Sequence, residues 1–543
     1  MRSTFMGLET SRSGLFTQQS ALYTTGHNIS NANTLGYSRQ RVNMQATPGF
    51  PTAGLNTPQF PGLMGTGVEA GSVQRVRDGF IDRQYRQETN KLGYWESRSQ
   101  AITQLEDVLN EPSEYGLAKS LDDFWKSLQD LSVNPENGGA RSVVVQRGIA
   151  VADSFNYMHK SVKQIQENAG AEIAVSLKDV NSILKQIASI NEQIKSVEPN
   201  GYMPNDLYDK RDILLDELST HFPIETTNVP SGGNALAIAE GSVTVSLKLK
   251  DGSTVKLVDG KDFAQLRTFG SNTSADHMTP TGPVEGFYIV EVDADGNDTY
   301  LSNDWKGTAP TAPVKQDILN FSGVGKLKSL AESFGYISSN GDEKGLYPDM
   351  IAKLNTMAKS FAEEFNKIHM GDPADPNYKQ GSDLNGNAGQ EFFINKSDNT
   401  ATSITAENIY VSSDIISDPG KIVASDSTPG TPEPGNGKFA LQLANMKFKG
   451  LSDLGDVSVQ IYFEGLIGQL GVDGQQAIRL TDSSALLQQA VLERRASVSS
   501  VSLDEEMTNM ITFQQAYNAN ARMITVVDET LDKIINGMGR VGL

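Results

Sequence analysis

The chain is 543 residues long, with 38% hydrophobic and 21% charged residues and a formal net charge of −20. This length is enough for roughly three or four domains, and the acidic balance argues against nucleic acid or an anionic membrane as a partner. Cysteine is absent, which excludes disulfides and thiolate metal sites. No apolar run approaches a membrane span, and residues Met1 to Gly7 lack the apolar stretch of a secretory signal peptide.

The first predicted element is a helix from about Thr4 to Ser30. It carries a weak seven-residue repeat, which is typical of a helix that lays one seam against a partner. The register of this repeat is Phe5, Leu8, Arg12, Leu15, Gln19, Leu22, Gly26 and Ile29. Asparagine and glycine then gather in residues 28–40. Because these residues adopt left-handed conformations and bond to the local backbone, we expect an ordered turn there.

A Pro- and Gly-rich stretch from Pro48 to Gly71 is expected to be an extended or irregular linker. The longest helix after it ends in a clear apolar repeat, closed by Pro199-Asn200-Gly201. That repeat is formed by Ile173, Leu177, Val180, Leu184, Ile187, Asn191 and Ile194. The predicted helices of this part cover residues 94–110, 117–131, 140–197 and 206–221, and together they indicate a helical bundle.

After Pro223 the apolar pattern changes to period two, which is typical of β-strands. Residues 243–249 alternate, Asp251-Gly252 predicts a hairpin turn, and a second hairpin joins residues 287–292 to 299–301. Residues 346–369 return to a helical pattern, residues 371–450 are interpreted as loop and strand, and further helices are expected to start near Val457 and Ile478. This order implies nested insertion, with the chain ends at the centre and the middle of the chain at the periphery.

The last predicted helix runs from Leu503 to Asn536, and neither Gly nor Pro interrupts it. Ser502, followed three residues later by Glu505, resembles a capping box. The register of this helix has alternating steps of four and three residues, with Asp528 between Ile524 and Leu531, and its seam residues are Leu503, Met507, Met510, Gln514, Tyr517, Ala521, Ile524, Leu531 and Ile535. Residues 1–45 carry a net charge of +3 and residues 501–543 a net charge of −3, which favours pairing of the two terminal helices.

The string from Gly26 to Gln40 resembles the N-terminal signature of bacterial flagellar axial proteins, the family of rod, hook and junction proteins. Its ending, Tyr37-Ser38-Arg39-Gln40, looks specifically like that of the junction members. The C-terminal strings of residues 495–507 and 513–517 agree with the same family.

Two positions depart from the family pattern: Leu35 stands where the family usually has proline, and Ser500 where it usually has glycine. Both change the local stiffness of the chain and leave the overall match intact. The resemblance implies that the N-terminal signature and the C-terminal seam serve assembly. The signature residues are Asn28, Ile29, Asn31, Asn33, Gly36, Tyr37, Arg39 and Gln40.

The expected fold is α+β and multidomain. We expect the N- and C-terminal helices to pair as a coiled-coil-like core domain, next to a long-helix bundle, with β-rich outer parts inserted in the middle of the chain. The expected divisions are residues 1–45 with 500–543 (terminal helices), 46–222 with 346–372 and 452–499 (bundle), 223–345 (β-rich outer domain) and 373–451 (β-rich variable outer segment).

The resemblance also implies a function, which is that of a structural protein forming the junction between hook and filament. Such a protein is exported to the extracellular flagellum without a cleaved signal peptide and forms a homo-oligomeric layer of a hollow axial tube. The implied partners are the hook protein, the second junction protein and an export chaperone that binds the C-terminal segment. Two alternatives stay open: a different axial protein, such as hook or distal rod, or an axial protein whose outer domain is an enzyme or adhesin.

The sequence contains no convincing catalytic or ligand-binding motif. Gly323-Val324-Gly325-Lys326 resembles part of a phosphate-binding loop, but Asn320 and Leu327 occupy the positions of the first glycine and of the Ser/Thr. The histidines lack metal-ligand spacing, and paired acids such as Glu505-Glu506 are interpreted as solvated helix faces. We therefore predict a non-enzymatic protein with no catalytic, metal-binding or cofactor-binding residues.

Overall fold

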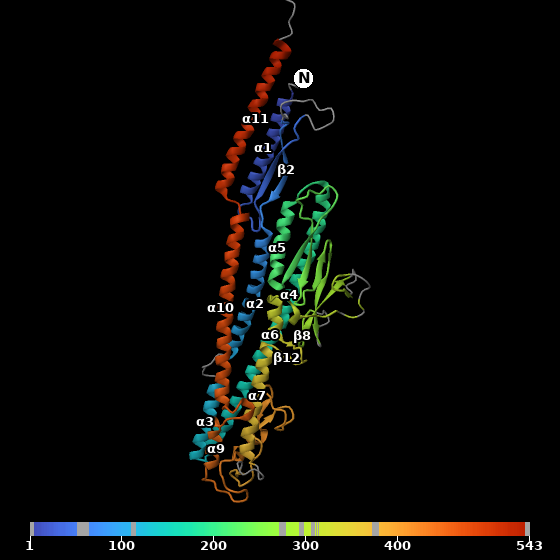
Figure 1. Ribbon diagram of the computed structural model, residues 1–543. Coiled ribbons are helices and arrows are strands. Elements are labelled where there is room, and N and C mark those ends of the chain that lie inside the picture. The colour runs from blue at the N-terminus through green and yellow to red at the C-terminus, as the bar shows by residue number, and fades with distance from the viewer. Residues whose placement is uncertain are drawn as a thin grey trace, which may run out of the picture.

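The computed structural model describes residues 5–50, 65–109, 116–270, 278–292, 298–305, 310, 312, 314–371 and 379–537. The chain forms a long rod (Figure 1). The first and last helices, α1 (Met6–Ser30) and α11 (Leu503–Gly537), lie side by side at one end of the rod, and the short helix α9 (Lys438–Asn445) lies at the other end. The expected α+β fold, with long helices at both ends of the chain and sheets in its middle, is confirmed.

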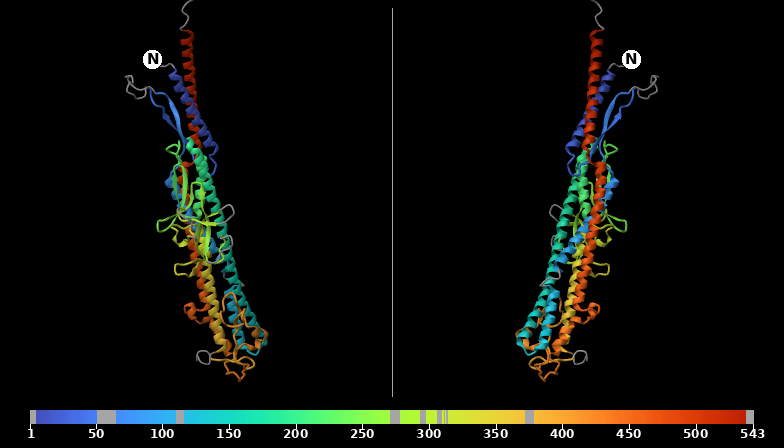
Figure 2. Two further views of the ribbon diagram at one scale, coloured as in Figure 1. Left: turned by 90° about the vertical axis from the view of Figure 1, so that its right-hand side faces the viewer. Right: turned by 90° about the vertical axis from the view of Figure 1, so that its left-hand side faces the viewer.

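The bundle of the rod is built from long helices that run along its length (Figure 2). Besides the three already named, the helices are α2 (Gly79–Leu109), α3 (Leu117–Val133), α4 (Gly138–Val197), α5 (Asn205–His221), α6 (Lys326–Phe334), α7 (Leu346–Met370), α8 (Ser413–Ser417) and α10 (Val459–Ser499). The helix α10 packs along α2, and α3 packs against α4 and α9.

The strands form several small sheets. They are β1 (Gln40–Ala46), β2 (Val68–Arg75), β3 (Ile224–Val229), β4 (Ser242–Lys248), β5 (Thr254–Asp259), β6 (Asp262–Phe263), β7 (Gln265–Gly270), β8 (Val284–Val292), β9 (Asp298–Tyr300), β10 (Gln316–Asp317), β11 (Tyr336–Ile337), β12 (Glu343–Lys344), β13 (Phe393–Asn395) and β14 (Ile409–Val411). One sheet has the order β3-β4-β5-β6, another is centred on β8, and β1–β2 and β13–β14 form separate pairs.

Both predicted hairpins of the middle region are present. The turn between β4 and β5 places Gly252 at φ 84°, the left-handed conformation that glycine adopts without a steric penalty. The strand β8 pairs with β9 as expected. The predicted repeat of α4 is buried, and the two sheets dock on this helix through asparagines. Asn191 bonds to the backbone of Val243, and Asn181 bonds to both backbone groups of Leu266.

Two helices differ from their predicted extents. The helix α2 begins at Gly79, well before the expected start at residue 94. Its first half buries polar side chains such as Arg86 and Asn90, so an apolar pattern could not reveal it. The helix α10 is one continuous element, although two helices were expected there. Its glycines weaken the local helix preference, and packing along α2 carries the helix through them.

The segment of residues 379–451 differs from the β-rich outer segment that we expected. It contains the short strands β13 and β14, with short helices and turns around them. Phe392 and Phe393 are fully buried and pack against Phe124, Phe361 and Phe365 of the bundle. This part of the chain therefore completes the core at the far end of the rod. None of the helices in the described ranges combines the length and apolar character that crossing a bilayer requires.

His369, at the end of α7, ties this segment to the bundle. Its ring is fully buried. Nδ1 lies 2.6 Å from the carbonyl oxygen of Gln390, and Nε2 accepts the N–H of Val423 at 3.0 Å. Both ring nitrogens are thus satisfied by the neutral tautomer that carries its proton on Nδ1. Burial lowers the pKa of His369 to about 4.

The first prediction follows from this pKa. An unfolded histidine takes up a proton near pH 6.5, whereas folded His369 resists protonation down to about pH 4. The neutral ring therefore stabilises the fold fully above pH 6.5, and this contribution falls by about 1.4 kcal/mol per pH unit as the pH drops toward 4. We expect His369→Gln to reduce that slope. Unfolding in denaturant can be followed by the fluorescence of Trp125. This side chain is buried in the folded chain, and its ring centroid lies 5.8 Å from that of Phe361 on α7.

The comparison is made between pH 7 and pH 4.5 in a background where Trp95 and Trp305 are replaced by Phe. His369→Gln is expected to lower stability at pH 7 because it disturbs two hydrogen bonds. The informative quantity is the difference in slope from the parent protein. Equal slopes for the two proteins would contradict this account of His369.

Candidate functional site

The terminal helices run antiparallel and approach each other closely (Figure 1). A Cβ atom at Gly14 of α1 would lie 2.9 Å from the side chain of Asn520 on α11, and one at Gly7 would meet Val527. The buried face of α1 is made of small or polar residues: Ser11, Gly14, Thr17, Ala21, Thr24, Thr25 and Asn28. Pairing of the two helices was predicted correctly. The predicted register on α1 was wrong, because close helix approach selects small side chains rather than large apolar ones.

A second neighbour covers α1 on another side. The hairpin of β1 and β2 packs against this helix, and the hydroxyl of Thr17 donates to the carbonyl of Val68 at 3.1 Å. Thr10 makes a similar bond to Thr66 at 3.4 Å. The expected boundary after residue 45 therefore falls inside a unit, since β2 belongs with the terminal helices. The expected linker from Pro48 to Gly71 includes the start of β2, and its residues 51–64 lie outside the described ranges.

Only part of the seam predicted on α11 faces α1. Five members of the register are half-buried: Met510, Tyr517, Ala521, Ile524 and Leu531. The remaining members, Leu503, Met507, Gln514 and Ile535, are exposed in the single chain. The buried positions that the register missed include Glu506, and Asn520 and Val527 also face α1.

The point where α1 ends and α11 begins, here called the root, is organised by Asn28. Its amide is 1% exposed, and all of its hydrogen-bonding capacity is used. Nδ2 donates to the Gln40 carbonyl at 2.8 Å and to Glu506 at 3.1 Å. Oδ1 accepts the Gln40 N–H at 3.0 Å and the Tyr37 hydroxyl at 2.8 Å. The side chain therefore fixes the backbone of β1 against both terminal helices.

Tyr37 completes this hydrogen-bond network. Its hydroxyl donates to Asn28, so the contact of 2.9 Å with His27 is donated by Nδ1 of the histidine. Burial, reinforced by Asp206, Asp209 and Glu506, raises the pKa of Tyr37 well above its ordinary value. The phenol therefore keeps its proton and remains a donor to Asn28.

Arg39 links the two ends of the chain through ion pairs. Its Nε donates to Glu506 at 2.8 Å and a terminal nitrogen donates to Glu505 at 2.7 Å, while its backbone N–H donates to the Ser499 carbonyl. The side chain of Glu506 is only 3% exposed, whereas that of Glu505 is 61% exposed. The interpretation of this acid pair as a solvated face was thus wrong for Glu506. Its carboxylate can be buried because it is paired with Arg39 and hydrogen-bonded to Asn28.

The other signature residues shape the turn. Gly36 adopts φ 76°, and a Cβ there would collide with Ile213 at 2.4 Å, so glycine is required by both backbone and space. Asn31 bonds to the His27 carbonyl at 3.1 Å, Ile29 is half-buried and Asn33 is exposed. Gln40 contacts the start of α5 through Asp206 and Asn205.

The two departures from the family pattern are accommodated without strain. Leu35 is exposed, and Ser500 lies between α10 and α11 in an extended conformation with φ −74°. Neither residue adopts a positive φ, so neither position requires glycine. Ser502 accepts the N–H of Glu505 at 3.5 Å, as a capping residue would.

A cluster of arginines and aspartates lies directly below the root, where α2, α5 and α10 meet the hairpin. Its hub is Asp212, which contacts Arg75 at 2.8 Å, Arg77 at 3.1 Å and Arg86 at 3.1 Å. We call this set the root cluster: Arg75, Arg77, Arg86 and Arg495 with Asp82, Asp209, Asp212 and Asp216. Burial alone would raise the pKa of Asp212, but the surrounding arginines outweigh it and hold the pKa well below its usual range.

Sequence reasoning missed the root cluster, although two signals were available. The acids of α5 at positions 209, 212 and 216 are spaced to share one helix face, and Arg75 and Arg77 have the two-residue spacing that places side chains on one side of an extended chain. The cluster binds the hairpin to the bundle, and Ser38 extends it by donating its N–H to Asp209 at 3.0 Å. Each carboxylate of the root cluster is paired with at least one arginine. Within the described ranges, no three His, Cys, Asp or Glu side chains gather to hold a metal ion.

Comparison with known proteins agrees with this geometry. The family described as the flagellar hook-associated protein FlgK helical domain matches residues 102–393. The flagella basal body rod protein family matches residues 8–37, and the C-terminal family of flagellar basal body rod proteins FlgEFG matches residues 494–537. The flagellar hook-associated protein 1 of Bacillus subtilis (strain 168) is 42% identical over 542 residues, which is 99% of each chain. The chain belongs to the flagellar hook-associated protein 1 family.

Members of the hook-associated protein 1 family are structural proteins of the flagellar axis, and the hook–filament junction is where this family acts. The relative in Escherichia coli (strain K12) is 26% identical over 603 aligned residues, covering 96% of this chain and 98% of that one. The structure of the flagellar hook junction protein FlgK from Burkholderia pseudomallei covers 77% of this chain and 100% of its own, with a TM-score of 0.57 at 14% identity. That likeness shows a shared fold.

The second prediction concerns Glu506 in this hook-associated protein 1 family member. Glu506→Ala leaves Arg39 with one exposed partner and removes an acceptor from Asn28, so we expect it to destabilise the pairing of α1 with α11 by about 2–4 kcal/mol. Hydrogen exchange of the α1 and α11 amides measures this directly. Glu505→Ala removes the exposed partner of the same arginine and is the matched control, with an expected cost below about 1 kcal/mol. Equal effects of the two substitutions would refute the central role of the buried carboxylate.

Proposed function

We propose that this chain forms a closed homo-oligomeric layer of the hollow flagellar axis between hook and filament, assembled through its paired terminal helices. The observation that supports this is the apolar surface that the pair leaves exposed. Large side chains of α1, of Phe5 directly before it and of α11 are about half exposed or more in the single chain: Phe5, Phe16, Tyr23, Met507, Ile511, Met523, Val526 and Ile535. Exposed apolar surface on this scale is typical of a protein-interaction site.

The expected partners follow from a position between hook and filament. We infer contacts with the hook protein on one side and with the second junction protein on the other. An export chaperone is expected to bind the C-terminal segment before assembly, because α11 presents an apolar surface that has to be kept from premature contact. The chain then acts as an extracellular flagellar component exported without a cleaved signal peptide, and its role is structural rather than enzymatic.

The third prediction tests assembly apart from folding. Ile511 lies on α11 and is 55% exposed, so Ile511→Asp should leave the fold of the single chain unchanged. Once a neighbouring subunit covers this position, the carboxylate is desolvated without a partner, at a cost of several kcal/mol in each subunit. We expect cells that carry Ile511→Asp to have hooks with at least tenfold fewer filaments and to shed flagellin into the medium. Electron microscopy of cells and immunoblots of the medium provide the readout.

The control is Thr508→Asp, which places the same charge on a neighbouring exposed polar position of α11. Export of each variant is measured separately, because the same segment is expected to bind the chaperone. A chain with Ile511→Asp that is exported normally and still supports normal filaments would overturn assembly through this helix.

A further inference from the structure

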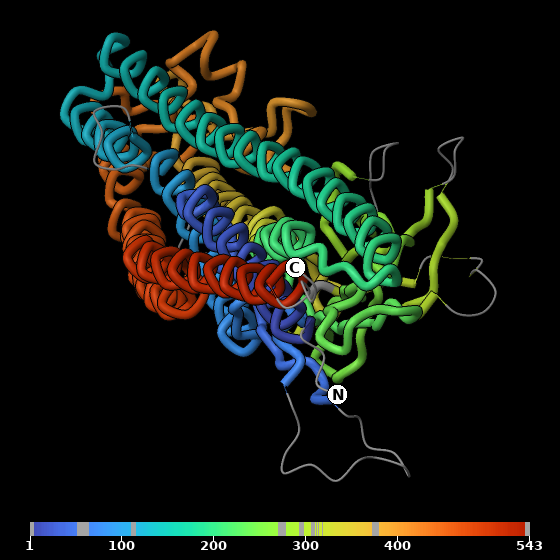
Figure 3. Tube along the Cα trace, turned by 90° about the horizontal axis from the view of Figure 1, so that it is seen from above, coloured from blue at the N-terminus to red at the C-terminus, as the bar shows by residue number. Residues whose placement is uncertain are grey.

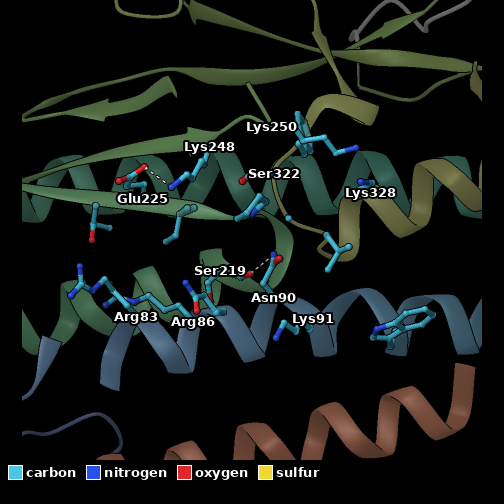
Figure 4. A pocket seen from close by; sticks show the side chains of 18 residues that line it. Arg83, Arg86, Asn90, Lys91, Ser219, Glu225, Lys248, Lys250, Ser322 and Lys328 are labelled. Atoms are coloured by element: carbon cyan, nitrogen blue, oxygen red, sulfur yellow. Dashed lines mark hydrogen bonds and ion pairs between the residues drawn. The ribbon is translucent and has the colours of Figure 1, made fainter. Parts of the chain in front are cut away.

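A cleft of about 750 Å³ opens at mid-rod, between α2 on one side and the sheet edge at β3 and β4 on the other, with the start of α6 at its end (Figure 4). Seen along the rod, the sheets that contain β4 and β8 stand on one flank of the helices (Figure 3). The cleft is separate from the root and from the exposed surface of the terminal helices. Its lining is unusual for a chain with a net charge of −20.

Cationic side chains dominate this lining. They are Arg83, Arg86, Lys91, Lys248, Lys250 and Lys328, whereas the lining includes a single carboxylate, Glu225. Three of the six have partners: Arg86 belongs to the root cluster, Lys91 pairs with Glu88, and Lys248 lies 3.8 Å from Glu225. Among the described residues, no carboxylate lies within ion-pair distance of Arg83, Lys250 or Lys328.

Lys328 is the strongest pointer to a ligand. It is 9% exposed, lines the cleft and has no ion-pair or hydrogen-bond partner for its ammonium group among the described residues. Burial lowers its pKa, the charge of Glu332 further along α6 opposes that shift, and the charge of Lys250 adds to it. It also lies in the first turn of α6, a helix without a side-chain cap, where free backbone N–H groups add positive potential. Its side chain is largely buried while its ammonium group has no ion-pair partner among the described residues, so an anionic ligand in the cleft would gain a charge-assisted contact there.

The shape and remaining lining narrow the class of ligand. Arg83 and Lys91 are eight residues apart on α2, so their positions are about 12 Å apart along the helix axis. The lining also includes the apolar side chains of Trp95, Ile224 and Phe321. The strand β3 is an edge strand of its sheet and supplies residues to the lining. A single phosphate group could reach only a fraction of these features, whereas an extended peptide can present carboxylates and apolar side chains alternately.

We propose that this cleft binds an acidic, extended peptide segment, with one carboxylate received by Lys328 and Lys250 and others by Arg83 and Lys91. An acidic segment of a neighbouring subunit in the flagellar axis is the natural source. That source rests on the proposed function, whereas the binding itself does not, because it belongs to the free chain. The cleft would thus give the rod a lateral contact in addition to the contacts of its terminal helices.

The test measures binding by the free full-length chain, so its failure is distinguishable from a failure of the proposed assembly. The probe is a fluorescein-labelled octapeptide in which glutamate alternates with leucine, followed by fluorescence anisotropy at low ionic strength. We expect binding in the micromolar range. Lys328→Met, which keeps an unbranched apolar side chain and removes the charge, should weaken binding at least tenfold, and Lys250→Glu should weaken it further.

The matched control is Lys195→Met, which removes an exposed lysine of α4 far from the cleft. It should leave the affinity unchanged within twofold. Inorganic phosphate at equal ionic strength should compete no better than chloride. The proposal is overturned by any of three results: no binding of the peptide below 1 mM (about −4 kcal/mol), an equal loss with Lys195→Met, or strong competition by phosphate, which would assign the cleft to phosphate groups instead.

Discussion

The structure depends on the burial of one carboxylate, that of Glu506. A charge taken out of water is tolerated only where it is paired and its remaining lone pairs are satisfied, and here Arg39 and Asn28 meet that condition together. Both partners belong to the other end of the chain. The first forty residues and the last forty are therefore held in one register. If either helix slid along the other, Glu506 would lose Arg39 and Asn28 and its buried carboxylate would be unpaired. The root cluster then transmits this register to the bundle, because Ser38 and Arg75 both bind Asp209.

How far the sequence could predict the fold depends on what was being buried. Where apolar residues are buried, periodicity was reliable: the repeat from Ile173 to Ile194 and the alternation of residues 243–249 lie in the core. Where polar or small residues are buried, it failed. The first half of α2 and the inner face of α1 look solvated by composition, although Arg86 and Thr17 are buried. Burial of such residues depends on partners far away in the chain, and a local sequence pattern does not reveal those partners.

The sequence indicated which residues of the N-terminal string form the candidate site, but not which residues they contact. Asn28, Gly36, Tyr37, Arg39 and Gln40 were all singled out from the N-terminal string, and the structure brings them together at the root. Their partners on α5 and at the start of α11 were missed, because acids on a helix are most often solvated. Only the three-dimensional arrangement distinguishes the buried Glu506 from its exposed neighbour.

The small inner face of α1 has a consequence for the geometry of a ring. The distance between two packed helices is set by the side chains at their contact, so the glycine and threonine face of α1 makes the terminal pair thinner than a pair with leucines between its helices. Subunits arranged around an axis are wedges, and the circumference available to each one shrinks toward the centre. A layer built on the terminal helices needs the thin edge of its wedge there. In the ring that we propose, the side-chain volume left out of α1 would help to set how many copies can meet around a channel of a given width.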